Sequence, residues 1–163
     1  MISTDVLAKL SLFEGLSEAA LGTIAAMSRE LTYAPERTIF SPEQPSEHLY
    51  VLLEGSVRLT LFVSTLSGPV TIASLKTPGQ AFGFSAVVGR GHHHSSAEAS
   101  TEVRVIAVNS RALMDYLEME PSVGFVLMKR IAAVISQRLA SLRRLLVETI
   151  NDYEKPASAT AEN

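Results

Sequence analysis

The sequence predicts an α+β fold, in which helices flank a single block of antiparallel strands. Helical periodicity covers residues 3–28, and short β-branched or aromatic runs then fill residues 29–109. Helical periodicity returns over residues 110–150. Because no helical pattern separates the strands from one another, a parallel sheet built from βαβ units is not expected.

Two short helices are expected at the N-terminus. Ser3 or Thr4 can cap the first helix, Gly15 ends the turn that follows, and Ser17 begins the second helix. The second helix carries apolar residues at helical spacing, namely Leu21, Ile24 and Ala25.

Proline and glycine separate the short central runs, a pattern typical of a sandwich or barrel of antiparallel strands. Within this block, the segment LLEGSVRL is interpreted as a β-hairpin with Gly55 at its turn.

The C-terminal part predicts a short helix capped by Asn109 or Ser110, followed by a long helix that begins at Pro121. Five residues of the long helix, all apolar except the last, follow the 4-3-4-3 spacing of a coiled-coil seam: Ile135, Leu139, Leu142, Leu146 and Thr149. Further apolar residues widen this stripe: Ile131, Val134, Leu145 and Ile150. We therefore expect a homodimer through this helix, with packing of the whole stripe inside one chain as the alternative.

Composition and length indicate one globular domain over residues 1–150, with a flexible tail at 151–163. Of the 163 residues, 47% are apolar and 19% are charged. The net charge of −3 gives no overall support for binding to nucleic acid or to an anionic membrane. Cysteine is absent, which excludes disulfides and thiolate sites. With no signal-peptide pattern and no apolar run of the ~20 residues that a membrane span needs, we expect a cytoplasmic protein.

Several fragments together resemble the cyclic nucleotide-binding domain of the Crp/Fnr type. LFEGLSEAALGTIAAM and HLYVLLEGSVRL resemble its leading helix and first strands, and PGQAFGFSAVV resembles the entry into its phosphate-binding cassette. SSAEASTEVRVIAV resembles the strand after the cassette. The resemblance covers about residues 8–148. It implies a jelly-roll barrel (a double-stranded β-helix) of about eight antiparallel strands, and a non-catalytic sensor whose ligand is a cyclic nucleotide, cAMP or cGMP.

The resemblance also implies the ligand-binding residues: Phe82, Gly83, Phe84, Ser85, Ala86, Arg90, His93, His94, Ser95, Ser96 and, on the long helix, Arg143. Members of this family hold the ribose with a Glu and the phosphate with an Arg. Phe84 stands at the position of the Glu, and His93 or His94 stands near that of the Arg, while Arg90 lies earlier in the loop. We therefore expect weak or altered nucleotide binding, with a domain that only mediates protein interaction or dimerisation as the alternative.

Other functions receive less support. The run from His92 to His94 suggests a metal or haem site, in which alternate side chains of an extended loop would converge, but few further ligands lie nearby. No nucleophile elbow or third orienting group supports catalysis by His48 beside Glu47. Only 13 residues follow Ile150, so we expect no helix-turn-helix and no DNA binding.

Overall fold

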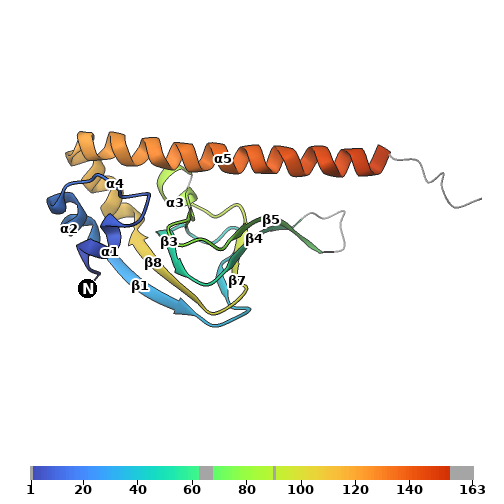
Figure 1. Cartoon of the computed structure of the whole chain (residues 1–163), viewed down its shortest axis with the longest axis horizontal. Helices are drawn as coiled ribbons and strands as arrows, with labels where there is room; N and C mark the ends of the chain where they lie inside the picture. The colour runs from blue at the N-terminus through green and yellow to red at the C-terminus, as the bar shows by residue number, and fades with distance from the viewer. Residues whose placement is uncertain (1, 63–67, 90, 155–163) are drawn as a thin grey trace, which may run out of the picture.

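The computed structural model describes residues 2–62, 68–89 and 91–154 and confirms the α+β fold (Figure 1). The helices are α1 (Thr4–Ala8), α2 (Glu18–Ala26), α3 (Ser85–Val88), α4 (Ser110–Met119) and α5 (Pro121–Glu154). The strands are β1 (Ser28–Tyr33), β2 (Thr38–Phe40), β3 (His48–Glu54), β4 (Val57–Phe62), β5 (Pro69–Leu75), β6 (Ala81–Phe82), β7 (Ser96–Ala99) and β8 (Val103–Asn109). None of the described helices combines the length and apolar character needed to cross a bilayer.

The eight strands form two antiparallel sheets that face each other. The first sheet has the strand order β1-β8-β3-β6, and the second has the order β2-β7-β4-β5. The predicted eight-stranded jelly roll is therefore confirmed, but the described strands do not hydrogen-bond from one sheet to the other, so the barrel is not closed.

The helices begin where their capping residues predict. Ser3, Ser17 and Asn109 each accept a hydrogen bond from a backbone N–H of the following turn, which caps α1, α2 and α4. Pro121 begins α5, where its missing N–H leaves no intrahelical bond unmade. The helix continues to Glu154 and so includes residues 151–154 of the expected tail, while residues 155–163 lie outside the described residues.

The segment around Gly55 does not form the predicted hairpin. β3 pairs with β6 and β8 in the first sheet, whereas β4 pairs with β5 and β7 in the second. Gly55 instead carries the chain from one sheet to the other, with a φ of 90°. A Cβ at this position would overlap the carbonyl oxygen of Glu102, so only glycine fits here.

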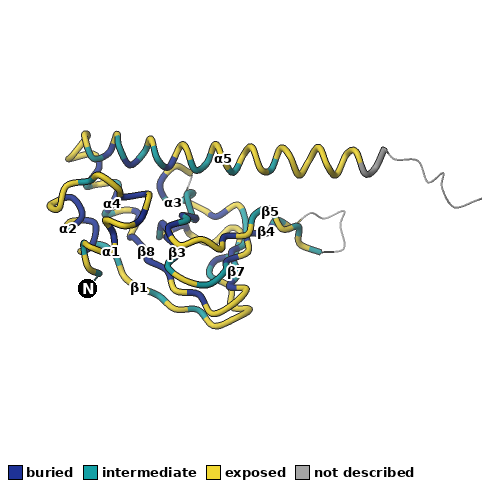
Figure 2. Tube along the Cα trace, in the orientation of Figure 1, coloured by how far each residue is buried: buried dark blue, intermediate teal, exposed yellow. Residues whose placement is uncertain are grey.

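The core has two parts, because successive residues of β3 point to opposite faces of the first sheet. Leu49 and Val51 pack against the helices, while Tyr50 and Leu52 face the second sheet. The helical part of the core includes two fully buried residues of α5, Leu127 and Ile131. The first half of α5 is thereby fixed to the domain, while its second half is exposed almost all round (Figure 2).

Candidate ligand-binding site

The cassette segment begins at the end of β6, where Gly83 adopts a φ of 77°. A Cβ on Gly83 would lie 2.9 Å from Cδ2 of Tyr50 and 3.0 Å from the carbonyl oxygen of His48. The contact with Tyr50 is closer than a Cβ atom tolerates, the contact with His48 is unusually tight, and the positive φ independently favours glycine. Gly83 therefore lets the chain pass close to β3 before it turns into α3.

Phe84 lies directly before α3, with its side chain half-buried against the helical part of the core. The guanidinium carbon of Arg138, on α5, lies 5.7 Å from the centroid of the Phe84 ring. This distance is within the range of a cation–π interaction. The position that the resemblance assigns to a ribose-binding Glu thus carries an apolar ring covered by an arginine of α5.

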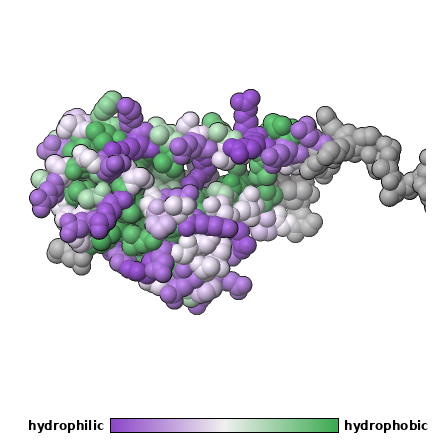
Figure 3. Space-filling view, in the orientation of Figure 1, coloured by the Kyte–Doolittle hydropathy of each residue, from purple (hydrophilic) through white to green (hydrophobic). Residues whose placement is uncertain are grey.

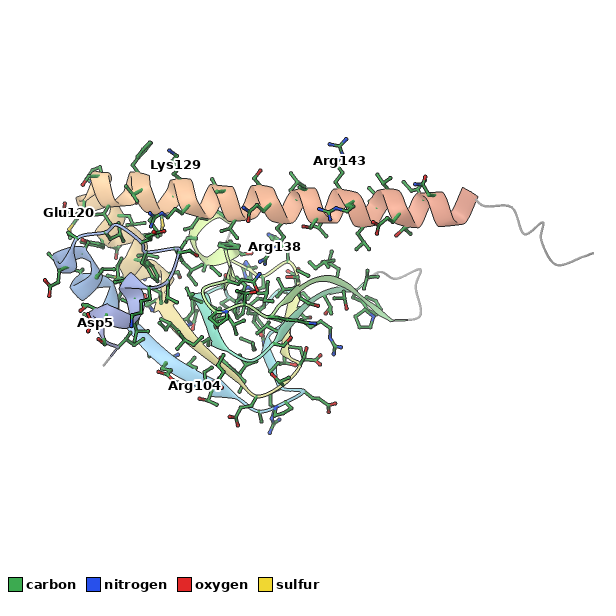
Figure 4. The ribbon with its side chains drawn as sticks, viewed as in Figure 1. Asp5, Arg104, Glu120, Lys129, Arg138 and Arg143 are labelled. Carbon is green, nitrogen blue, oxygen red and sulfur yellow. The ribbon has the colours of Figure 1, made fainter. Side chains whose placement is uncertain are left out.

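Arg138 is the one labelled α5 arginine that points toward the strands (Figure 4). Its Nη2 donates a hydrogen bond to the carbonyl oxygen of Ala81, at 3.2 Å. Burial lowers the pKa of the Arg138 guanidinium from its ordinary value. Among the described residues no carboxylate forms an ion pair with it. The site therefore contains a half-buried positive charge whose local partners are a carbonyl dipole and an aromatic ring.

A cavity of about 540 Å³ opens beside Arg138, between β5, the turn that leads to β6, and α5. Its polar lining comes from both sides: Ser11, Ser74, Thr77, Gln80, Gln137, Arg138 and Ser141. A second, shallower cavity continues along α5 and is lined by Arg144 and Glu148 as well as by β5. The described lining of this cavity includes the chain just before Phe82, from Pro78 to Ala81, but none of the ligand-binding residues that the resemblance implies. The space in this structure is therefore displaced from those residues.

His93 is buried, with 3% of its surface exposed, and it stacks on Phe40. Its backbone N–H donates to the carbonyl oxygen of Gln44, and its own carbonyl oxygen accepts from the N–H of Glu43. Burial, and then the charge of His94, lower the pKa of His93. A neutral imidazole in contact with a phenyl ring is poorly suited to the phosphate contact expected for it.

His92 and His94 are both exposed, on either side of the buried His93. Within the described ranges, no group of three His, Cys, Asp or Glu side chains is arranged to hold a metal ion. The alternation expected of an extended loop is present, but it places the middle histidine in the core.

The structure places the other predicted site residues in several settings. Ser85 and Ala86 form the first turn of α3, and Ser95 and Ser96 are half-buried at the start of β7. Arg90 lies outside the described residues.

Arg143, which was assigned to the pocket on its position along the helix, is exposed and points away from the strands (Figure 4). The sequence analysis did not single out Arg138. Arg138 lies seven residues, close to two helical turns, after the buried Ile131, so both side chains leave α5 on nearly the same face. This spacing is the signal from which its inward position could be predicted.

Comparisons with known proteins agree with this architecture. The family model described as the cyclic nucleotide-binding domain matches residues 30–120. A solved protein from Geobacter metallireducens GS-15, assigned as a cyclic nucleotide-binding protein, is 33% identical, with a TM-score of 0.75 over 85% of this chain and 99% of that one. The N-terminal domain of a transcriptional regulator from Streptomyces coelicolor A3(2) is 26% identical, with a TM-score of 0.65 over 83% and 93% of the two chains.

A CRP-like cAMP-activated global transcriptional regulator from Mycobacterium tuberculosis is 23% identical over 146 residues, which are 90% of this chain. The match covers 62% of that regulator, so the chain spans less than two thirds of the length of the curated relatives it matches.

Proposed function

Since this chain belongs to the cyclic nucleotide-binding domain family, we propose that it is a non-catalytic sensor of a small molecule, with weak or altered binding of cyclic nucleotides. The ligand would bind between the strands and α5, and would report its presence through α5. The observation that carries this proposal is the placement of Arg138 over Phe84, beside an open cavity.

The substitution of the ribose-binding and phosphate-binding side chains supports weak binding of cyclic nucleotides. A phenyl ring at residue 84 accepts no hydrogen bond, and the buried His93 offers no charge to a phosphate. Loss of one charged hydrogen-bonding partner costs about 1–3 kcal/mol of binding free energy. Loss of both lowers affinity by roughly two to four powers of ten.

The exposed face of α5 supports dimerisation with a second copy of this chain. Apolar side chains continue the predicted seam toward the N-terminal end of the helix, since Phe125 is 71% exposed, Leu139 66% and Leu146 60%. Together with the residues between them, they give a 3-4 repeat: Phe125, Met128, Ala132, Ile135, Leu139, Leu142, Leu146 and Thr149. Two members of this repeat, Met128 and Ile135, already pack in part against the helical part of the core. An identical helix placed alongside would bury this repeat as a coiled coil.

Apolar surface also gathers near the second half of α5, where the helix passes the β4 and β5 strands (Figure 3). Phe62, the last residue of β4, is 74% exposed. Since α5 both lines the cavity and carries the exposed repeat, a ligand in the cavity acts on the same helix that a partner chain would contact. This shared element is the physical basis for coupling between ligand and dimer.

The direct test measures binding and assembly in the same samples. Purified protein is titrated with cAMP and with cGMP up to millimolar concentration by calorimetry, and its mass is followed by light scattering. Dissociation constants well above those of a complete cassette, together with a ligand-dependent change in dimer affinity, support the proposal. Sub-micromolar cAMP binding at pH 8 contradicts it.

A second candidate is a domain that binds no small molecule and acts only in protein interaction. The aromatic filling between the sheets favours it, because Phe82 stacks on Tyr50 with centroids 5.2 Å apart, and Phe40 lies against both rings. A stable dimer whose assembly is unaffected by any ligand tested would make this second candidate the better one.

A further inference from the structure

We propose that the cavity between β5 and α5 is a binding site for a small organic anion, whose phosphate or carboxylate group is held by Arg138. This inference rests on the proposed sensing function and moves the charged contact from the cassette to α5. It assigns the ligand's anionic group to a cavity whose described lining includes none of the ligand-binding residues that the resemblance implies.

The first argument concerns charge. Arg138 is half-buried, and within the described part of the chain it makes one hydrogen bond, to Ala81, and no ion pair. A guanidinium has five N–H donors in a planar fork and stays protonated in proteins. A charge that has lost part of its water and has no carboxylate beside it gains strongly from an anion, particularly one that accepts two of its hydrogen bonds.

The second argument concerns the shape and chemistry of the space beside Arg138. A volume of about 540 Å³ is in the range of small-molecule sites, roughly 300–1,000 Å³. Hydroxyl and amide groups line the same cavity as Arg138, with Ser74 and Thr77 on the strand side and Gln137 and Ser141 on the helix side. These groups can donate hydrogen bonds to further oxygens of the ligand, and among the described residues no acidic side chain lines the cavity.

The third argument concerns the position of the Arg138 guanidinium. The cation–π contact with Phe84 and the hydrogen bond to Ala81 fix Arg138 at the wall of the cavity. Both interactions leave part of the guanidinium available, because each uses one face or one N–H of the group. The side chain is therefore positioned before the anion arrives, which lowers the entropic cost of binding.

The experiment compares the wild type with Arg138→Gln, Arg138→Lys and the matched control Arg143→Gln, which removes an exposed arginine from the same helix. The probes are AMP, cAMP and citrate, with adenosine as the uncharged analogue and sodium chloride to match ionic strength. Unfolding is followed by differential scanning fluorimetry, and affinity is measured by calorimetry. Circular dichroism of the unliganded variants shows whether each one folds as the wild type does.

At least one of the three anions is expected to raise the Tm of the wild type and of Arg143→Gln by about 3–5 °C at ten times its Kd. Arg138→Gln is expected to lower the affinity for that anion about 10- to 100-fold, and the affinity of Arg138→Lys should lie between those of the wild type and Arg138→Gln. Adenosine is expected to give no Arg138-dependent shift. The AMP and citrate arms distinguish an organic phosphate from a carboxylate as the ligand group.

The inference is overturned if no anion shifts the wild type, or if the shifts are equal in wild type and Arg138→Gln. Binding of cAMP that is unaffected by Arg138→Gln leaves the proposed nucleotide sensing intact and removes this inference. Binding of AMP or citrate that requires Arg138, without binding of cyclic nucleotides, keeps this inference and removes nucleotide sensing.

Discussion

The imidazole ring of His93 lies parallel to the phenyl ring of Phe40, with the two centroids 3.7 Å apart and an angle of 5° between the planes. This stack joins the loop that follows α3 to the interior between the two sheets. It also removes His93 from solvent, which disfavours the charged form of the ring.

The stability of the protein is expected to fall as pH falls below about 6.5, the ordinary pKa of histidine. Because the pKa of His93 is lowered in the folded state, the unfolded chain binds the proton first, and this favours unfolding. The contribution of neutral His93 to the free energy of unfolding is therefore complete at pH values above the pKa of His93 in the unfolded chain. It is lost as pH falls through the lower pKa of His93 in the folded protein. His48, whose pKa is lowered by burial and then by Arg29, acts in the same direction.

The measurement is Tm between pH 7.5 and 5.5 for the wild type, His93→Phe and the exposed control His92→Phe, since His94 itself lowers the pKa of His93. His93→Phe keeps an aromatic ring on Phe40 but has no titratable group, so its Tm should depend less steeply on pH. An unchanged slope in His93→Phe would show that the buried imidazole does not control acid stability.

A charge within the exposed repeat of α5 should prevent dimerisation. Leu139→Asp places a carboxylate in the middle of the expected helix pair, where burial of an exposed leucine contributes about 1.5–3 kcal/mol per chain. The dimer Kd should therefore rise at least 100-fold, as measured by analytical ultracentrifugation. Ala140→Asp adds the same charge on another face of the helix and should have little effect. A wild-type chain that is monomeric at tens of micromolar would refute the dimer itself.

Replacement of Gly83 should destabilise the fold more than replacement of Gly91. Both residues have positive φ, 77° and 82°, so an alanine at either position carries a similar backbone cost of about 1–2 kcal/mol. At Gly83 the added Cβ also meets Tyr50 and the His48 carbonyl, whereas at Gly91 it meets no atom of the described residues within 4 Å. Urea denaturation should show an additional loss of roughly 1–3 kcal/mol for Gly83→Ala. Equal losses of unfolding free energy in Gly83→Ala and Gly91→Ala would mean that β3 moves away from the added Cβ with no cost in stability.

Restoring the side chains that the family uses should restore binding of cAMP. The double variant Phe84→Glu with His94→Arg supplies a ribose acceptor and a phosphate partner, and we expect affinity for cAMP to rise about 10- to 100-fold in calorimetry. His94 is chosen because it is exposed, whereas His93→Arg would bury a charge against Phe40. The neutral pair Phe84→Gln with His94→Gln controls for loss of the native side chains. No gain would indicate that aromatic side chains already occupy the space between the sheets.

The order of the elements could be predicted from the sequence because the signals for it are local. Ser17 and Pro121 mark helix starts through their own side chains, and each of these starts was confirmed. The predicted hairpin at Gly55 was wrong. Alternating apolar residues and a turn glycine indicate that one strand follows another along the chain, but they do not show which strands pair by hydrogen bonds. The crossing between sheets depends on contacts with residues far along the chain, such as Glu102.

The site was predicted less completely than the fold. The resemblance predicted a cassette segment with Phe84 in place of a Glu, and these site residues stay a prediction, but the sequence analysis did not single out Arg138 among the arginines of α5. The phase of a helix relative to its domain decides which of them turns inward, and Leu127 and Ile131 fix that phase only through tertiary packing. The burial of His93 was likewise set by its contact with Phe40, a residue more than fifty positions earlier.

Because α5 is long, a small tilt of the helix produces a larger displacement at its C-terminal end. The helix is fixed at Leu127 and Ile131, and from Arg138 to Glu154 its axis advances about 24 Å at 1.5 Å per residue. A tilt of about 5° near Arg138 therefore displaces the far end by roughly 2 Å, as a lever arm does. Removing or adding whole helical turns after Arg138 would decrease or increase this displacement and leave the cavity beside Arg138 unchanged.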